Sequence, residues 1–210
     1  MLEMASIAEL MVGQSVEALA TLDTQLAMSV ILRDDEVDQR DLSIEERCVR
    51  LLALQQPMAG DLRIIGTAMK MITDIERIGD LAVDVAKIAL KIEHEYGQVG
   101  FIDLPRMANT ARSMFRQALE AYVRKDLNLV REVCERDEEV DEQYRELRAQ
   151  IFENMRAYPE MVVSDAWLLL AIHHVERIAD HAVNIAERVN FMVTGDFKQL
   201  KSSNREAQAS

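Results

Sequence analysis

The hydrophobic residues of this chain recur at intervals of three and four, which is the pattern of amphipathic helices. Between residues 62 and 96 the two intervals alternate without a break, which predicts a long helix with a continuous, coiled-coil-like stripe. The stripe consists of Ile64, Ala68, Met71, Ile75, Ile78, Ala82, Val85 and Ala89. The pattern returns near the end of the chain as Leu168, Ala171, Val175, Ile178, Ala182, Ile185 and Val189. We therefore expect two long and equivalent core helices.

The shorter elements follow from turn and capping residues. We expect three helices in the first half, over residues 1–22, 24–56 and 62–96. Asp23 is suited to cap the second helix and Asp61 the third, because an aspartate side chain can accept hydrogen bonds from the first free backbone amides. Pro57 interrupts the pattern between these two helices, and Gly97-Gln98-Val99-Gly100 ends the first half.

The second half of the chain repeats the first. Residues 33–38 match residues 136–141 at five of six positions, and residues 76–87 match residues 176–187 at seven of twelve. Helices joined by short loops pack antiparallel to their neighbours. The fold class predicted is all-α, with two tandem, pseudo-symmetric three-helix bundles. Their expected bounds are residues 1–97 and 103–194, followed by a frayed tail over 195–210.

Composition narrows the function. The formal net charge is −13, with 37 acidic against 24 basic residues, so no basic face is available for nucleic acid. The same charge disfavours docking on anionic lipid and is compatible with a cation or a basic partner. Cys48 and Cys134 are isolated, which argues against structural zinc and favours small core residues in a reducing compartment. The longest apolar run, residues 166–172, cannot span a membrane, and Glu3 and Glu9 interrupt any signal peptide. We expect a soluble, cytoplasmic protein.

Each half carries two acidic pairs with a spacing of four, one pair on the second helix and one on the third. This spacing places both carboxylates on one helix face, where like charges repel unless a cation offsets them. The pairs are Asp34/Asp38 and Glu76/Asp80 in the first half, and Asp137/Asp141 and Glu176/Asp180 in the second. Both pairs of a half lie similarly far from the connecting loop, so four carboxylates could converge on one patch. Asp84 and Asn184 could add a third oxygen ligand on each long helix.

Oxygen ligands suit hard cations, namely Mg²⁺, Mn²⁺, Ca²⁺ and ferric iron. The alternative is that these residues form the solvated face of an acidic helical protein. Arg77 and Arg177 are ordinary ion-pair partners under one interpretation, and contacts to phosphate or to a partner under the other. The residues alone leave both interpretations open.

Catalytic patterns are missing from the sequence. His173, His174 and His181 cluster on the last helix, where surface or partly buried imidazoles are expected more than metal ligands. None of the four histidines follows a glutamate by three residues, which argues against a di-iron carboxylate enzyme. There is no phosphate-binding glycine loop and no nucleophile–base set. We therefore predict a protein that is not an enzyme. The alternatives are a hydrolase of phosphoesters that uses a metal-bound water, and a metal-free interaction module whose acidic faces bind a basic partner.

Two motifs carry a resemblance to a known family. Gln55-Gln56-Pro57-Met58-Ala59-Gly60-Asp61-Leu62-Arg63, followed by Asp74-Ile75-Glu76-Arg77-Ile78-Gly79-Asp80, is similar to the PhoU family of phosphate-transport regulators. The resemblance covers nearly the whole chain. It implies a pair of three-helix bundles with E(D)-x-x-x-D motifs that can hold multinuclear metal clusters on the surface. In this sequence those motifs fall on Asp34, Asp38, Glu76 and Asp80, and again on Asp137, Asp141, Glu176 and Asp180.

The resemblance also implies differences between the two sites. The family pattern often continues as D-H-x-x-N, which the second copy keeps as Asp180-His181-Ala182-Val183-Asn184. The first copy has Leu81 and Asp84 instead, so the two sites should differ in metal affinity or occupancy. The metal would be iron, manganese, magnesium or zinc. Family chains usually have a further stretch of helix ahead of the position of Met1, so the first helix should be a shortened form.

The function implied by this resemblance is regulatory. PhoU-like proteins act in the cytoplasm when phosphate is plentiful. They are thought to link the ATPase of a phosphate ABC transporter to a sensor histidine kinase and to keep the phosphate-starvation response off. We therefore expect a negative regulator without catalytic activity, assembled as a homodimer, with no nucleic-acid partner and no direct membrane insertion.

Overall fold

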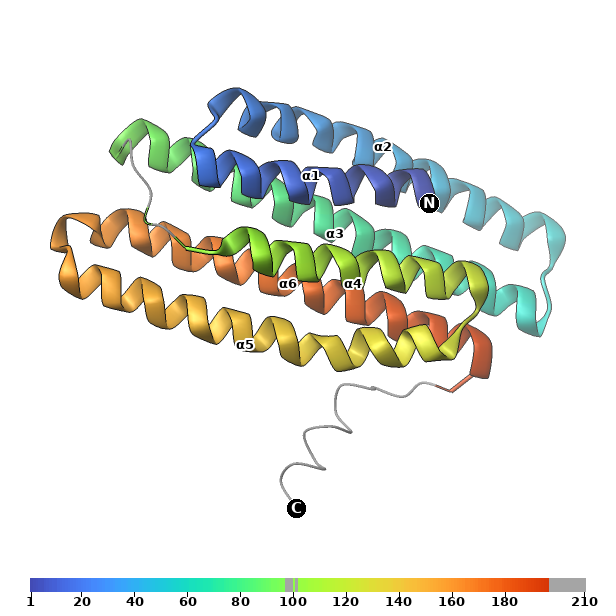
Figure 1. The fold of residues 1–210 in the computed structure, drawn as a ribbon. Helices are drawn as coiled ribbons and strands as arrows, with labels where there is room; N and C mark the ends of the chain where they lie inside the picture. The colour runs from blue at the N-terminus through green and yellow to red at the C-terminus, as the bar shows by residue number, and fades with distance from the viewer. Residues whose placement is uncertain (97–99, 101, 197–210) are drawn as a thin grey trace, which may run out of the picture.

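The structure, a computed structural model, describes residues 1–96, 100 and 102–196. Its elements are α1 (Leu2–Thr21), α2 (Thr24–Gln55), α3 (Ala59–Tyr96), α4 (Leu104–Arg124), α5 (Leu127–Ala157), the short 3₁₀ helix η1 (Pro159–Met161) and α6 (Val162–Thr194). Figure 1 shows α1, α2 and α3 as one antiparallel three-helix bundle and α4, α5 and α6 as a second. The predicted fold class is confirmed. The linker at 97–103 lies largely outside the described residues, as does the predicted tail beyond residue 196.

The local signals that start the helices are visible as caps. The Asp23 side chain accepts hydrogen bonds from the backbone amides of Gln25 and Leu26, as predicted. Asp126 caps α5 in the same way through the amide of Asn128. The prediction for Asp61 was wrong. The helix begins two residues earlier, at Ala59, because the Asp61 backbone amide already donates to the carbonyl of Met58.

Corresponding contacts show that the two bundles are structural repeats. Arg33 of α2 donates a hydrogen bond to Gln14 of α1 at 2.6 Å. One repeat later, Arg136 of α5 donates to Gln117 of α4 at 2.7 Å. Each arginine therefore ties the second helix of its repeat to the first through an amide oxygen.

The predicted stripes form the centre of the molecule. All the stripe residues of α6 are buried, and those of α3 are buried from Met71 onward. α3 and α6 pack against each other, so the two bundles share one hydrophobic core, and α1 also contacts α4. Ile78 and Ile178, which correspond in the repeat, are 0% and 1% exposed. Burial of apolar side chains on this scale is the main force that holds such helices together.

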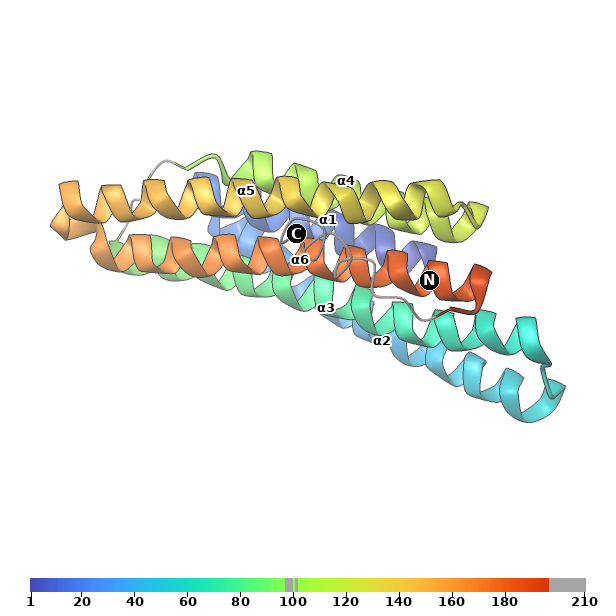
Figure 2. The same ribbon diagram turned by 90° about the horizontal axis from the view of Figure 1, so that it is seen from below.

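The longer helices of each repeat extend past the shorter one. Figure 2 shows the α2–α3 hairpin projecting at one end of the molecule and the α5–α6 hairpin at the opposite end. Among the described residues, no helix is long and apolar enough to cross a membrane. The fold therefore presents two long helix faces, one per repeat, on which the predicted acidic pairs lie.

Candidate carboxylate patches

The first acidic patch lies where α2 and α3 pack side by side. Asp34 and Asp38 come from α2, and Glu76 and Asp80 come from α3. Gly79 allows the close approach of the two helices, because a Cβ atom at this position would lie 3.7 Å from Asp34 Oδ1. The predicted neighbourhood of the two pairs is therefore present in the fold.

Electrostatic coupling shows how strongly these carboxylates interact. Burial, followed by the charges of Asp38 and Asp80, raises the pKa of Asp34 to about 6. Burial and the charge of Asp80 also raise the pKa of Glu76, and Asp41 adds to this effect. Asp41, one turn beyond Asp38 on α2, is thus a member of the patch that sequence reasoning missed. The atom Asp34 Oδ1 is buried and has no hydrogen-bond partner in the described part of the chain.

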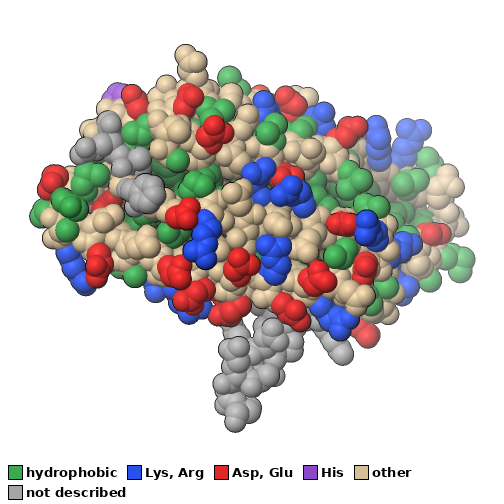
Figure 3. Space-filling model, viewed as in Figure 1, with side chains coloured by type: hydrophobic (Ala, Val, Ile, Leu, Met, Phe, Trp, Pro, Cys, Tyr) green, Lys and Arg blue, Asp and Glu red, His purple; other side chains and the backbone are tan. Residues whose placement is uncertain are grey.

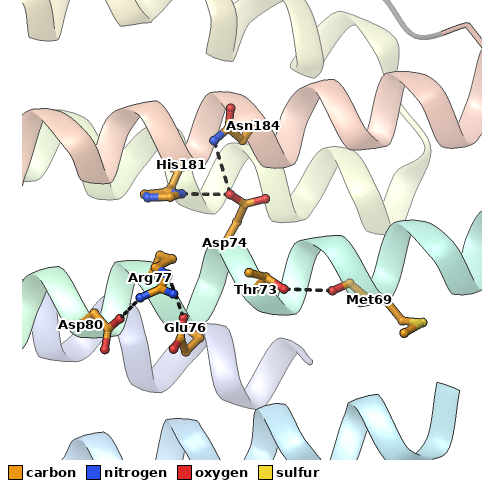
Figure 4. A network of polar contacts seen from close by, with 8 residues as sticks. All are labelled: Met69, Thr73, Asp74, Glu76, Arg77, Asp80, His181 and Asn184. Atoms are coloured by element: carbon orange, nitrogen blue, oxygen red, sulfur yellow. Dashed lines mark hydrogen bonds and ion pairs between the residues drawn. The ribbon is translucent and has the colours of Figure 1, made fainter. Parts of the chain in front are cut away.

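Arg77 supplies a positive charge at the edge of this patch. Its Nη1 donates to Asp80 Oδ2 at 2.7 Å, and its Nε lies 3.4 Å from Glu76 Oε2. Figure 4 shows the guanidinium between the two carboxylates. Because about half of the Arg77 side chain is exposed, this pairing is weak and can be exchanged with solvent. Of the two interpretations of Arg77, the structure shows the ion-pair partner.

The second acidic patch occupies the corresponding place on α5 and α6. Asp137 of α5 is only 5% exposed, whereas Asp141 is half-buried. On α6, Glu176 and Asp180 are half-buried, and His173 Nδ1 lies 3.3 Å from Glu176 Oε2. The residue that corresponds to Gly79 is Ala179, which is fully buried. The two patches therefore share their acidic residues but differ in burial and in their neighbours.

The arrangement of donors limits what the patches hold in this conformation. Within residues 1–96, 100 and 102–196, no three histidine, cysteine, aspartate or glutamate side chains converge closely enough to hold a metal ion. Glu76 and Asp80 are turned toward Arg77 instead. The donors are nevertheless all oxygen atoms, carry excess negative charge and include a buried unpaired one, which is the chemistry that hard cations favour.

Asp84 and Asn184, the two candidates for a third ligand, have other partners. Asn184 of α6 donates to Asp74 Oδ1 of α3 at 3.3 Å, and His181 Nδ1 lies 2.9 Å from the same oxygen (Figure 4). Asp84 pairs with Lys87 at 3.4 Å. Asp74 thus joins the two repeats through two side chains of α6, and this role was missed from the sequence.

A related contact lies at the equivalent place on the other side of the α3–α6 interface. His174 corresponds to Asp74 in the repeat, as Asp84 corresponds to Asn184. Burial lowers the pKa of His174, and the charge of Asp84 opposes this shift. The repeat offset, which pairs Asp74 with His174, is the signal by which both interface positions could have been found. As expected, the three clustered histidines are surface or partly buried side chains.

Taken together, the fold and the patches define a class of protein: a duplicated three-helix scaffold whose exposed faces carry acidic clusters. The profile of the PhoU domain matches residues 1–89 and 104–189. A Clostridium acetobutylicum protein named phosphate-specific transport system accessory protein PhoU homolog is 35% identical over 93% of this chain and 90% of its own length. The protein of that name from Pseudomonas aeruginosa is also 35% identical, over 93% of this chain and 81% of its own.

Solved structures agree with these matches. The crystal structure of PhoU from Pseudomonas aeruginosa covers 93% of this chain and 94% of its own, with 35% identity and a TM-score of 0.87. The phosphate transport system regulatory protein PhoU from Streptococcus pneumoniae covers 95% and 94%, with 30% identity and a TM-score of 0.87. The chain belongs to the PhoU family. Since these relatives are named as accessory and regulatory proteins, the prediction that the chain is not an enzyme is confirmed.

The raised pKa of Asp34 predicts an unusual pH dependence of stability. Below about pH 6 the folded protein holds this carboxyl protonated, whereas above it the folded state must hold an ionised carboxylate among other acids. Stability is therefore lost as pH rises through about 6. Asp34→Asn removes this loss. We expect the variant to gain about 1–2 kcal/mol over the wild type at pH 8 relative to pH 5, after allowance for partial exposure.

The measurement is urea unfolding of both proteins at the two pH values, in the presence of a chelator. Asp35→Asn is the matched control, because Asp35 is the exposed neighbour of Asp34 on the same helix. The control should show no such pH-dependent gain. An equal effect of Asp34→Asn at pH 5 and at pH 8 would contradict the assignment of strain to the ionised carboxylate.

Proposed function

We propose that this protein is a cytoplasmic regulator of phosphate uptake and of phosphate-starvation signalling. In this role it is a non-catalytic adaptor between a phosphate ABC transporter, through its ATPase, and a sensor histidine kinase. The observation that carries the proposal is the match to relatives named phosphate-specific transport system accessory proteins over nearly the whole chain. A rigid scaffold with long exposed helix faces suits an adaptor, because such faces can bind partners without a conformational change. The homodimer expected from the resemblance stays a prediction, which light scattering tests.

Deletion of the gene tests the adaptor function. We expect phosphate-responsive transcription to be high in the deletion strain even when phosphate is plentiful, because the negative regulator is missing. A transcriptional reporter measured in high and in low phosphate provides the readout, and the wild-type gene should restore repression. Unchanged transcription under both conditions would exclude the proposed function.

We also propose that the two acidic patches bind metal ions. Asp34, Asp38, Glu76 and Asp80 would hold the ion in the first patch, and Asp137, Asp141, Glu176 and Asp180 in the second. The support is the all-oxygen donor set, the raised pKa values of Asp34 and Glu76, and the unpaired buried oxygen of Asp34. A bound ion would offset the mutual repulsion of the carboxylates and give each patch a positive centre for an anionic group of a partner.

Elemental analysis of protein purified without an affinity tag tests this second proposal. The wild type should contain iron, manganese, magnesium or zinc, and the variant with Asp80→Asn and Asp180→Asn should lose it. The variant with Asp35→Asn and Glu138→Gln is the matched control, since these exposed positions correspond in the repeat and flank the patches. No metal in the wild type after incubation with each ion would favour a metal-free docking surface instead.

A further inference from the structure

The α2–α3 tip, defined as residues 47–63, exposes large hydrophobic side chains at one end of the molecule. Val49, Leu51, Leu54, Met58 and Leu62 are each between 46% and 80% exposed. In Figure 3, hydrophobic side chains gather together with basic ones at the end where α2 and α3 continue past α1. An exposed cluster of this kind on a folded protein marks an interaction surface more often than chance.

A single heptad ladder on α2 shows how this surface arises. Val30 and Val37 are fully buried, and Ile44, seven residues on, is half-buried. The next two steps, Leu51 and Met58, are 46% and 80% exposed. Since heptad positions keep the same helix face, the ladder continues past the point where its cover ends. α3 changes in the same direction, because its stripe residues Ile64 and Ala68 are only half-buried.

The cover that ends here is α1. Along the rest of the repeat, α1 packs on both α2 and α3 as the third helix of the bundle. Its first residue lies level with the start of the tip, since the charges of Arg47 and Cys48 act on the pKa of the Met1 ammonium, which burial lowers. Beyond this level, α2 and α3 have no third helix among the described residues. The tip is therefore two thirds of a three-helix bundle.

Charge indicates what would complete the bundle. The tip carries three arginines against one aspartate, in a chain whose net charge is −13. Arg47 and Arg50 are exposed, and no ion pair involves them within the described residues. α1, which covers the rest of this face, is itself amphipathic and carries Glu3, Glu9 and Glu17 without any lysine or arginine. The favoured occupant is thus an apolar helix with acidic flanks.

We propose that the α2–α3 tip binds an amphipathic helix of a protein partner, as a third helix that continues the line of α1. The apolar stripe of that helix packs on Leu51, Leu54 and Met58, and its acidic residues face Arg47 and Arg50. This mode of recognition uses the same ridge and groove packing as the bundle itself. The inference rests on the proposed adaptor function only for the reason that a partner exists.

The opposite end of the molecule provides an internal comparison. At the α5–α6 hairpin, Phe152, Tyr158 and Val163 are also exposed, between 45% and 55%. Residues 148–163, however, carry two arginines and two glutamates, so this end is electrically balanced. Apolar exposure is therefore similar at the two ends, and positive charge distinguishes the α2–α3 tip.

Fluorescence anisotropy with two synthetic helical peptides tests the proposal on the full-length protein. Both peptides carry the same leucine heptads, flanked by glutamate in one and by lysine in the other. We expect the glutamate peptide to bind the wild type, and Leu51→Asp with Met58→Asp to weaken binding by at least about tenfold. The matched control, Phe152→Asp with Val163→Asp at the other end, should bind as the wild type does. Arg47→Glu with Arg50→Glu should reverse the preference to the lysine peptide.

Several results would overturn the proposal. Equal binding of both peptides, or binding that the tip variant leaves unchanged, would show that the tip does not select an acidic helix. Retention on phosphatidylglycerol vesicles without peptide binding would assign the tip to lipid. Self-association that the tip variant abolishes would assign it to a second copy of the chain. The reporter result in the deletion strain is independent of all these readouts, so failure of the adaptor function is distinguishable from failure of this inference.

Discussion

The packing of α3 against α6 is the interaction on which the rest of the structure depends. Both helices bury an uninterrupted apolar stripe, and these stripes merge the two three-helix repeats into one core. Because the core is continuous, the faces that point away from it are held in fixed positions. Asp74 adds a polar contact across the same interface through His181 and Asn184. A rigid scaffold of this kind can present two acidic patches and one basic, apolar tip at defined distances from one another.

The distribution of charge over this scaffold is uneven in a way that net charge conceals. Carboxylates are concentrated where the second and third helices of each repeat meet, and in the first patch burial and mutual repulsion raise the pKa of Asp34 and Glu76. Arg77 offsets part of that repulsion from an exposed position. The α2–α3 tip has the opposite sign. A net charge of −13 argues against docking to anionic partners for the chain as a whole, but this argument does not apply to the tip.

Most of the fold and the location of the patches could be predicted, because an unbroken heptad-like period and an exact internal repeat specify core faces and helix order. The finer assignments failed for physical reasons. Asp84 and Asn184 lie eight residues after Glu76 and Glu176, and each step of four residues turns the side chain by about 40° around the helix. After two steps Asn184 faces α3 instead of the patch. Asp74 was missed because a single aspartate on a helix carries no signal until the neighbouring helix is placed beside it.

The most direct test of the shared core is urea unfolding of the wild-type protein, followed by two probes at once. Trp167, the only tryptophan, lies on α6 and reports on the second repeat, whereas far-ultraviolet circular dichroism reports on all helices. If α3 and α6 unite the repeats in one cooperative unit, the two transitions coincide in midpoint and in slope. A fluorescence transition separated from the circular dichroism transition would show that the repeats unfold independently, and would contradict the central role of the α3–α6 interface.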